Sequence, residues 1–310
     1  MILKKITIEN FRCFKNYEVD LTPGITVFIG KNGAGKTSLL NAIRYGLSVF
    51  FSNDSTMGDD LLISGNPDLK VISTLATDFY RAQNADLPAV DLTINMEAEF
   101  NDIPLNWEYY KRSTSGASLF VSKYQQAYRT LMAEYHNSDQ LPLFVFYSDS
   151  FPHIDTRTSD FAKKAIKEQG YIIRNFAYYK WNSEVSCTSI WQNRFINSML
   201  KQISLNDSDP LNSKEVEYIK NKLRTFSEPI NSALEEKDDF EIKDFFPVVD
   251  DKTLSLYLRL KNERDVIFDN LPAGYKRLYS IAFDLAYRCK HSASCVFFSP
   301  LFLPTFVASL

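Results

Sequence analysis

The amino-acid sequence predicts an α/β protein with a mixed sheet that is interrupted by a helical insertion. Three patterns support this fold class. Apolar and polar residues alternate, as in half-buried strands, near the N-terminus, over residues 90–100 and again over residues 254–260. Between Val216 and Leu234, apolar residues recur at spacings of three and four, the period of a helix face. A short apolar run, Ile25–Ile29, leads directly into a glycine-rich loop and an amphipathic stretch.

The first fifty residues predict three strands, a loop and a helix, in that order. Ile6–Ile8 and Tyr17–Leu21 alternate with the period of a strand, and Pro23-Gly24 turns the chain. The nearly continuous apolar run Ile25–Ile29 is typical of a strand buried on both faces. The helix after the loop carries an apolar face formed by Leu39, Leu40, Ile43, Leu47 and Phe50.

The middle of the chain begins with strands and then becomes helical. Residues 90–100 and 105–112 predict an antiparallel pair with a turn at Asn101-Asp102. Leu143–Tyr147 is a further candidate for a buried strand. Residues from about 158 to 237 have helical character, and Pro229 predicts a kink in the second helix.

A strand over residues 254–260 and a turn at Asn270–Gly274 precede a last amphipathic helix. We therefore divide the chain into an N-terminal lobe at 1–150, a helical insertion at 151–250 and a partial C-terminal lobe at 251–310.

Composition excludes several classes of protein. The 310 residues are 45% hydrophobic, enough for a large core, and the net charge of −3 gives no overall case for nucleic acid, although a local basic groove stays open. The four cysteines form no Cys-x-x-Cys pair, so neither a zinc site nor a disulfide framework is indicated. The N-terminus does not resemble a signal peptide, and no apolar run is long enough to span a membrane. We expect a cytoplasmic protein without a membrane partner.

The glycine-rich loop matches the phosphate-binding pattern G-x-x-x-x-G-K-[ST]. Its glycines let successive backbone N–H groups point at phosphate oxygens, the lysine reaches the β- and γ-phosphates, and the Thr37 hydroxyl binds Mg²⁺. A glycine-rich turn before a helix is the alternative, but a strand that enters the loop and a helix that leaves it favour the phosphate site. We expect ATP with Mg²⁺, bound by Gly30, Lys31, Asn32, Gly33, Ala34, Gly35, Lys36, Thr37 and Ser38.

The residues around the loop narrow the class further. The sequence ENFRCF at residues 9–14, a second strand, and then VFIGKNGAGKTSLLNAI at residues 27–43 resemble the RecF/SMC branch of the ABC-type ATPases. The resemblance implies an ABC-type head that hydrolyses ATP to gate a partner or nucleic acid in DNA repair or anti-phage defence. It also implies that Arg12 lies near the nucleotide, and often near DNA; an exposed turn residue is the alternative.

A second segment, Leu271–Arg277, is similar to the signature motif of that family, which begins Leu-Ser-Gly-Gly. The resemblance implies that Gly274, at a helix N-terminus, contacts the γ-phosphate held by an opposite subunit in a head-to-head homodimer or higher oligomer. Pro272 replaces the serine that usually contacts the phosphate, which removes a side-chain contact but not the backbone one. A proline-glycine loop that caps a helix is the plainer interpretation.

The helical middle is too short for a long coiled-coil arm. The order of segments in the chain therefore resembles the compact ATPases of bacterial anti-phage systems. This resemblance implies an effector nuclease as a partner. The strand ending in Asp-Glu that hydrolysis requires in this family does not follow the signature-like segment. Val296–Phe298 is followed by Ser-Pro, and Asp149 is a weak rival because it precedes the segment. From Cys289 onward charged residues nearly vanish, which predicts a shifted reading frame or a truncated product. The C-terminal lobe would then be incomplete. Its open sheet edge and apolar tail predict poor solubility.

Two other functions remain open at this point. An ATP-dependent binding or sensor module that does not hydrolyse ATP, or an inactive remnant, fits the missing acidic motif. A small-molecule kinase fits less well, because such enzymes usually start at the phosphate-loop strand. Tyr109–Arg112 combines aromatic and basic residues that suit nucleic-acid phosphates, with a solvated strand face as the plainer interpretation.

Overall fold

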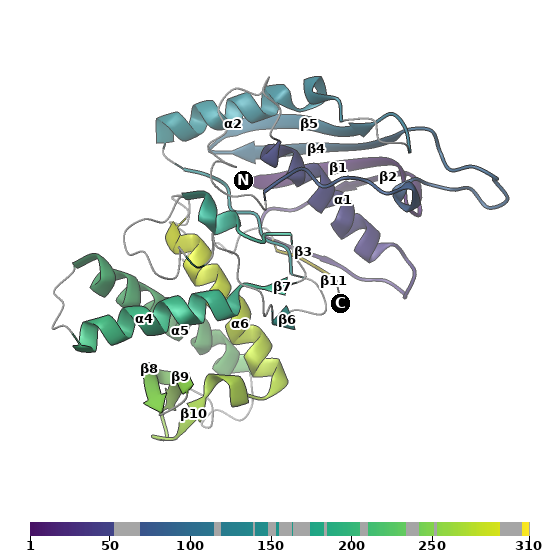
Figure 1. Cartoon of the computed structure of the whole chain (residues 1–310). Coiled ribbons are helices and arrows are strands. Elements are labelled where there is room, and N and C mark those ends of the chain that lie inside the picture. The colour runs from purple at the N-terminus through teal and green to yellow at the C-terminus, as the bar shows by residue number, and fades with distance from the viewer. Residues whose placement is uncertain are drawn as a thin grey trace. The chain divides into compact units, whose positions relative to one another are not determined.

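A computed structural model of the chain shows two compact units (Figure 1). The structure describes residues 1–52, 69–114, 119–138, 140–147, 153–154, 163, 174–182, 185–204, 210–233, 242–250, 253–291 and 306–309. Contacts group residues 1–144 with 293–310 in the first unit and residues 145–292 in the second. The division at residues 150 and 250 that the sequence suggested stays a prediction.

The first unit is built on a four-stranded antiparallel sheet in the order β2-β1-β4-β5. Its strands are β1 (Ile2–Phe11), β2 (Phe14–Asp20), β4 (Leu92–Phe100) and β5 (Ile103–Lys111). The predicted pairing of residues 90–100 with 105–112 is confirmed. Asn101 and Asp102 both have positive φ, at 50° and 63°, as a two-residue hairpin turn requires.

One face of this sheet is covered by helices. The helix α1 (Lys36–Ser48) packs against β4 and β1, and α2 (Gln125–Ser138) packs against β5. Trp107 donates its indole N–H to the Gly46 carbonyl at 2.7 Å, and a Cβ on Gly46 would overlap the Met96 side chain. Because Gly46 has no side chain, α1 lies close to the sheet. Short 3₁₀ turns follow at η1 (Val49–Phe51), η2 (Ala76–Asp78) and η3 (Val121–Lys123).

The strand that enters the glycine-rich loop differs from its prediction. The strand β3 (Ile25–Phe28) pairs in parallel with β11 (Phe306–Ser309). Ile25, Val27 and Ile29 are 52%, 46% and 85% exposed. The prediction that this run is buried on both faces is therefore wrong, because only one strand pairs with β3 in the described part of the chain and its apolar side chains stay open to solvent.

The second unit combines helices with a small antiparallel sheet in the order β10-β9-β8. Its elements are β6 (His153–Ile154), η4 (Arg174–Tyr178), β7 (Val185–Ser186), α4 (Thr188–Ser204), α5 (Pro210–Ala233), β8 (Ile242–Asp250), β9 (Thr253–Leu260), β10 (Asp265–Ile267), η5 (Phe268–Asn270) and α6 (Ala273–His291). The strand predicted at residues 254–260 and the helices on either side of it are confirmed. The helix α5 continues past Pro229.

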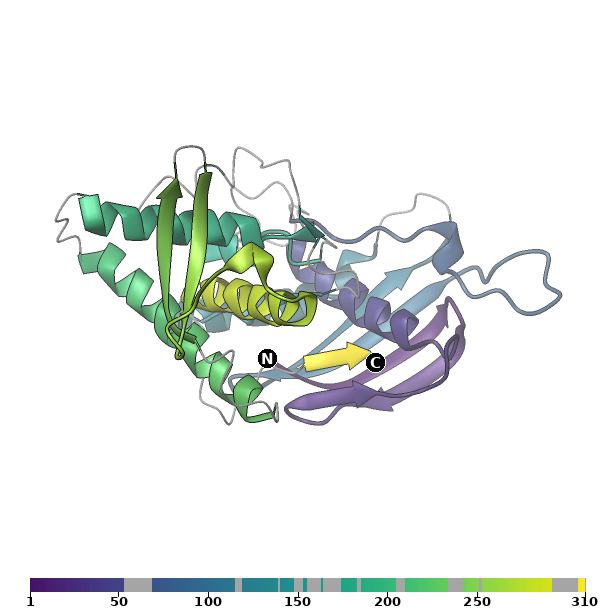
Figure 2. The same cartoon turned by 90° about the horizontal axis from the view of Figure 1, so that it is seen from below.

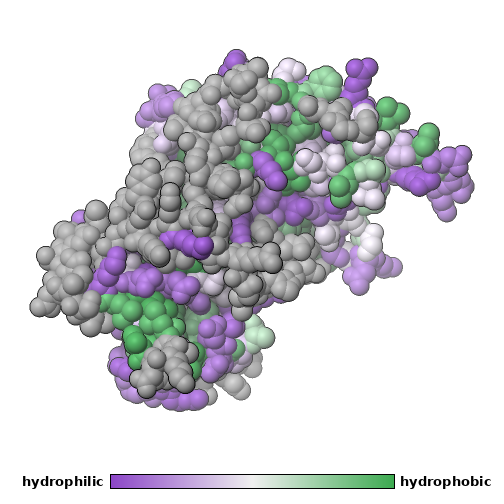
Figure 3. Space-filling model, in the orientation of Figure 1, coloured by the Kyte–Doolittle hydropathy of each residue, from purple (hydrophilic) through white to green (hydrophobic). Residues whose placement is uncertain are grey.

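The long hairpin of β8 and β9 lies beside α4 (Figure 2). β8 was not predicted, because its sequence does not alternate and contains Pro247, a residue that sheets accept mainly at an edge. Figure 3 shows a patch of hydrophobic side chains in the region where this hairpin lies in Figure 1. Two apolar residues of the hairpin, Val249 and Leu254, are exposed.

The predicted strand at Leu143–Tyr147 is wrong. Residues 140–147 contain no strand, and the chain passes from the first unit to the second within them. Phe144 is buried against Phe50 in the first unit, and the Phe146 N–H donates to the Trp181 carbonyl in the second. Aromatic packing and the Phe146 backbone hydrogen bond are found here instead of the strand ladder that the apolar pattern suggested.

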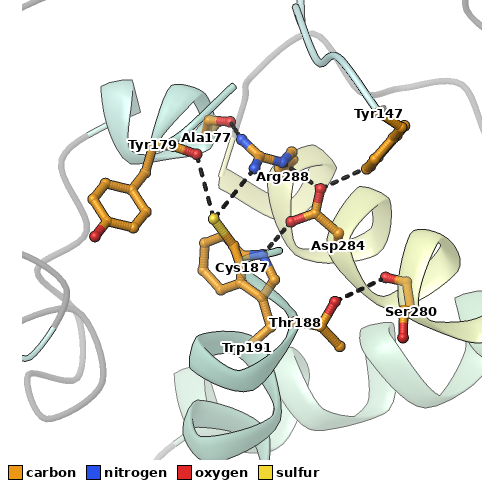
Figure 4. A network of polar contacts seen from close by, with 9 residues as sticks. All are labelled: Tyr147, Ala177, Tyr179, Cys187, Thr188, Trp191, Ser280, Asp284 and Arg288. Atoms are coloured by element: carbon orange, nitrogen blue, oxygen red, sulfur yellow. Dashed lines mark hydrogen bonds and ion pairs between the residues drawn. The ribbon is translucent and has the colours of Figure 1, made fainter. Parts of the chain in front are cut away.

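A buried polar network fixes α6 within the second unit (Figure 4). The Asp284 carboxylate accepts hydrogen bonds from Tyr147 Oη at 2.7 Å, Trp191 Nε1 at 2.6 Å and Arg288 Nε at 2.6 Å. Arg288 also donates to the Ala177 carbonyl at 2.6 Å. Asp284 and Arg288 are 1% and 2% exposed, so this ion pair is fully enclosed. No helix in the described ranges is both long and apolar enough to cross a membrane.

Candidate functional site

The loop at residues 30–37 connects β3 to α1 and has a conformation that its glycines permit. Gly33 and Gly35 have φ values of 84° and 90°, in the left-handed region that residues with a side chain rarely adopt. The Ala34 N–H donates to the Lys31 carbonyl at 3.1 Å, which closes a tight turn inside the loop. This curl is the conformation in which successive backbone N–H groups converge on an anion.

Gly35 is also required for space. A Cβ at this position would lie 2.9 Å from Cys13 Sγ and 2.8 Å from the Phe14 ring. Cys13 belongs to the connection between β1 and β2, and Phe14 is the first residue of β2, so this connection and the start of β2 pack directly on the loop. The glycine thus meets two independent demands, one from backbone geometry and one from its neighbours.

The side chain of Lys36 lies across the loop. Its ammonium donates to the Gly30 carbonyl at 2.6 Å and to the Lys31 carbonyl at 3.3 Å. No side chain caps the start of α1, where Gly35 is the N-cap residue, so the helix offers its first N–H groups and its positive end at the loop. Thr37 is exposed in the first turn, and Ser38 is half-buried next to it.

Arg12 lies in the same connection as Cys13 and adopts a left-handed backbone with φ of 49°. Its Nε donates to Asp78 Oδ1 at 2.9 Å, and its backbone N–H donates to the Asp78 carbonyl at 2.7 Å. The sequence analysis did not find Asp78, because no motif surrounds it and its partner lies 66 residues away in the chain. The contact of Arg12 with the nucleotide stays a prediction.

Gly274 occupies the second position of α6, where the prediction of a helix N-terminus is confirmed. Pro272, Ala273 and Gly274 are all exposed, and a Cβ on Gly274 would meet no atom within 4 Å. Lys276 anchors this end of the helix through Asp269, by a 3.0 Å ion pair and a hydrogen bond to its carbonyl. No contact within the described residues requires a glycine at position 274.

Two other candidate regions have different outcomes. Asp149 and residues 296–298 lie outside the described residues, as does most of the apolar C-terminal tail. Tyr109 is fully buried and donates its hydroxyl to the Ile72 carbonyl at 2.7 Å, so it is not available to nucleic-acid phosphates.

Comparison with known protein families matches residues 1–294 to the AAA ATPase domain. The chain belongs to the AAA ATPase domain family. The chain is therefore an ATPase head, and the expected α/β fold of the P-loop type is confirmed.

The curated relatives that the chain matches include DNA repair proteins. It is 23% identical over 175 residues to the DNA replication and repair protein RecF of Azobacteroides pseudotrichonymphae, which is 56% of this chain and 46% of the relative. It is 44% identical over 62 residues to RecF of Lactobacillus acidophilus, 20% of this chain and 16% of that protein. It is 38% identical over 63 residues to the DNA double-strand break repair Rad50 ATPase of Halobacterium salinarum, 20% of this chain and 7% of that protein.

The aligned stretches thus span less than half the length of these relatives. Solved structures similar to the chain include the SMC head domain from Thermotoga maritima, with a TM-score of 0.40, 12% identity and coverage of 95% of this chain and 75% of that one. Another is the SMC head bound to the C-winged helix domain of ScpA, with a TM-score of 0.47, 11% identity and coverage of 92% and 76%. The expected resemblance to the RecF/SMC branch is confirmed by the family and these relatives.

Proposed function

We propose that this chain binds ATP with Mg²⁺ at residues 30–38 and that bound ATP joins two copies of the head. The observation that carries the first part is the curled loop with left-handed Gly33 and Gly35, which ends in an uncapped helix start. Backbone N–H groups and a helix N-terminus at one place form a site for a polyphosphate.

Two side chains of the loop, Lys36 and Thr37, have separate roles in this proposal. Lys36 exchanges its two carbonyl acceptors for phosphate oxygens when the nucleotide binds, since a charged acceptor is stronger than a neutral one. The exposed Thr37 hydroxyl supplies one oxygen to Mg²⁺. A single protein oxygen fits this ion, which commonly takes its other ligands from substrate phosphates and water.

Replacing Lys36 by alanine tests the site. We expect the affinity for a fluorescent ATP analogue to fall by about 10- to 100-fold, because a charge-assisted hydrogen bond of about 1.5–3 kcal/mol is lost. Lys15→Ala is the matched control, because Lys15 is an exposed lysine on β2 and lies outside the loop. Equal affinities of Lys36→Ala and the parent chain would rule out this loop as the ATP site.

The same samples decide whether the chain hydrolyses ATP. Turnover that depends on Lys36 would establish an ATPase with an acidic residue not yet located, and Asp149 would be the first to replace. Binding without turnover would establish the alternative, a non-hydrolysing ATP-dependent binding module.

The second part of the proposal concerns the exposed start of α6. Glycine in the first turn of a helix has a cost relative to alanine, and no neighbour in the described part of the chain explains it at position 274. We propose that this end of α6 accepts the γ-phosphate of ATP bound to a second copy, through backbone N–H groups that a side chain would obstruct.

Replacing Gly274 by aspartate is expected to abolish ATP-dependent dimerisation while ATP binding by the monomer stays within about twofold of the parent. Aspartate suits a helix N-terminus, so the fold is retained, but its charge repels the triphosphate. Sedimentation with a non-hydrolysable ATP analogue measures the dimer, and Gly274→Ala is the control for the loss of glycine alone. An unchanged dimer in Gly274→Asp would contradict the proposed contact.

The physiological role belongs to the same proposal. The relatives' names, DNA replication and repair for RecF and DNA double-strand break repair for Rad50, support a head that gates nucleic acid or a partner protein. The anti-phage role and an effector nuclease rest on the sequence resemblance to compact defence ATPases.

A further inference from the structure

We infer that Asp78 is a positioning residue for nucleotide binding, because it holds Arg12 beside the phosphate loop and leaves the two terminal amino groups of the guanidinium for the triphosphate. The inference rests on the proposed ATP site and adds to it a residue that belongs to no motif. Asp78 lies at the end of η2, in the segment between α1 and β4.

The Asp78 carboxylate is 2% exposed and uses both oxygens. Oδ1 accepts from Arg12 Nε, and Oδ2 accepts from the Tyr45 hydroxyl and the Leu75 N–H, all at 2.9 Å. A buried carboxylate needs such partners to remain charged, and here the only cation that pairs with it among the described residues is Arg12.

The backbone reinforces this contact. The Arg12 N–H donates to the Asp78 carbonyl at 2.7 Å, and the Tyr80 N–H donates to the Asn10 carbonyl at 2.8 Å. Phe11 and Phe79 form an antiparallel bridge between these two bonds. Arg12 is therefore held on both main chain and side chain, which sustains a left-handed backbone that otherwise costs about 1–2 kcal/mol.

The guanidinium of Arg12 is anchored on one side and open on the other. Its Nε is bound to Asp78, whereas its two terminal nitrogens make no hydrogen bond within the described residues. The side chain is 30% exposed, and its guanidinium lies 5.2 Å from the centre of the Phe11 ring. An arginine held in this way presents a pre-oriented pair of donors, which suits a phosphate.

Asp78 also links this arginine to the helix that begins in the loop. Tyr45 belongs to α1, and Cys13 and Phe14, next to Arg12, lie against Gly35. Burial, and then the hydrogen bond to Asp78, raise the pKa of Tyr45 to about 12, so its hydroxyl remains a donor at neutral pH. One carboxylate thus contacts both the connection that carries Arg12 and the helix whose start binds phosphate.

The test is a double-mutant cycle on ATP affinity with Asp78→Asn and Arg12→Gln. We expect each single variant to weaken binding of the fluorescent ATP analogue by about 10- to 100-fold, the effect of one charge-assisted hydrogen bond. In the Arg12→Gln background, Asp78→Asn should change the affinity by less than about twofold, because Asp78 acts through Arg12. Thermal unfolding of all four proteins reports the purely structural part.

Tyr45→Phe is the matched control. It removes one of the two donors to Oδ2 but leaves the Arg12 contact, so it should lower the unfolding temperature while ATP affinity stays within about twofold of the parent. Equal losses of affinity from Asp78→Asn in both backgrounds would overturn the inference, as would wild-type affinity in Arg12→Gln, a variant whose amide can still donate to Asp78. Failure of the ATP site itself would show differently, as binding that is insensitive to Lys36→Ala.

Discussion

Replacing Gly35 by alanine is expected to weaken ATP binding by roughly 100-fold while the fold remains intact. Two costs add at this position. A left-handed backbone costs a residue with a Cβ about 1–2 kcal/mol, and the overlap with Cys13 and Phe14 adds about 1–3 kcal/mol. The exposed loop relieves both by changing its shape, which removes the curl that the phosphates need. Each 1.4 kcal/mol corresponds to about a tenfold change in affinity.

Gly33→Ala is the internal control for this experiment. Gly33 has a similar φ of 84°, but a Cβ there would meet no atom within 4 Å. Only the backbone cost applies, so its affinity for the fluorescent ATP analogue should fall by about tenfold. If the two variants bind ATP equally well, the packing of the β1–β2 connection on Gly35 has no role in binding.

Replacing Asp284 by asparagine is expected to destabilise the second unit by about 3–5 kcal/mol. The change preserves the size of the side chain but leaves the enclosed Arg288 guanidinium without a countercharge. It also weakens the acceptor that Tyr147 and Trp191 share (Figure 4). Urea unfolding followed by tryptophan fluorescence measures the effect, because Trp181 and Trp191 both lie in this unit.

The matched control is Asp265→Asn, which also breaks an ion pair with an arginine in the same unit. Asp265 and Arg259 are exposed, and their ion pair of 2.9 Å is screened by water. The loss of stability should be at most about 1 kcal/mol. A similar small loss in Asp284→Asn would mean that water or another group compensates Arg288.

The phosphate loop was predictable from the sequence because its determinants are local. The strand, the glycine spacing and the helix periodicity all lie within residues 25–50, and each is set by neighbours in the chain. The hairpin of β4 and β5 was predictable for the same reason, since strict alternation and an Asn-Asp turn define it.

The remaining features depend on contacts between distant residues, which a pattern does not record. The partner of Arg12 is 66 residues away, and Tyr147 meets Asp284 across 137 residues. The apolar run at β3 predicted burial, but burial requires neighbours on both faces, and no local pattern specifies those. The prediction of a strand at Leu143–Tyr147 was wrong because a short apolar and aromatic run has the same composition whether it forms a strand or packs residue by residue against other elements.

The pairing of β1 has a consequence for the order of folding. β1 and β2 are joined by a tight connection and can pair as soon as both are made, whereas β4, on the other edge of β1, starts at Leu92. Until β4 and β5 dock, that edge has unpaired N–H and C=O groups, and α1 lacks β4, one of the strands against which it packs. Asp78 and Trp107 form hydrogen bonds with α1 and follow it in the chain, so the loop and α1 are held in place only after β5 has been made. A nucleotide that binds the loop in this state therefore stabilises the completed sheet selectively. ATP present during synthesis should thus favour the folded head over intermediates in which the edge of β1 is unpaired.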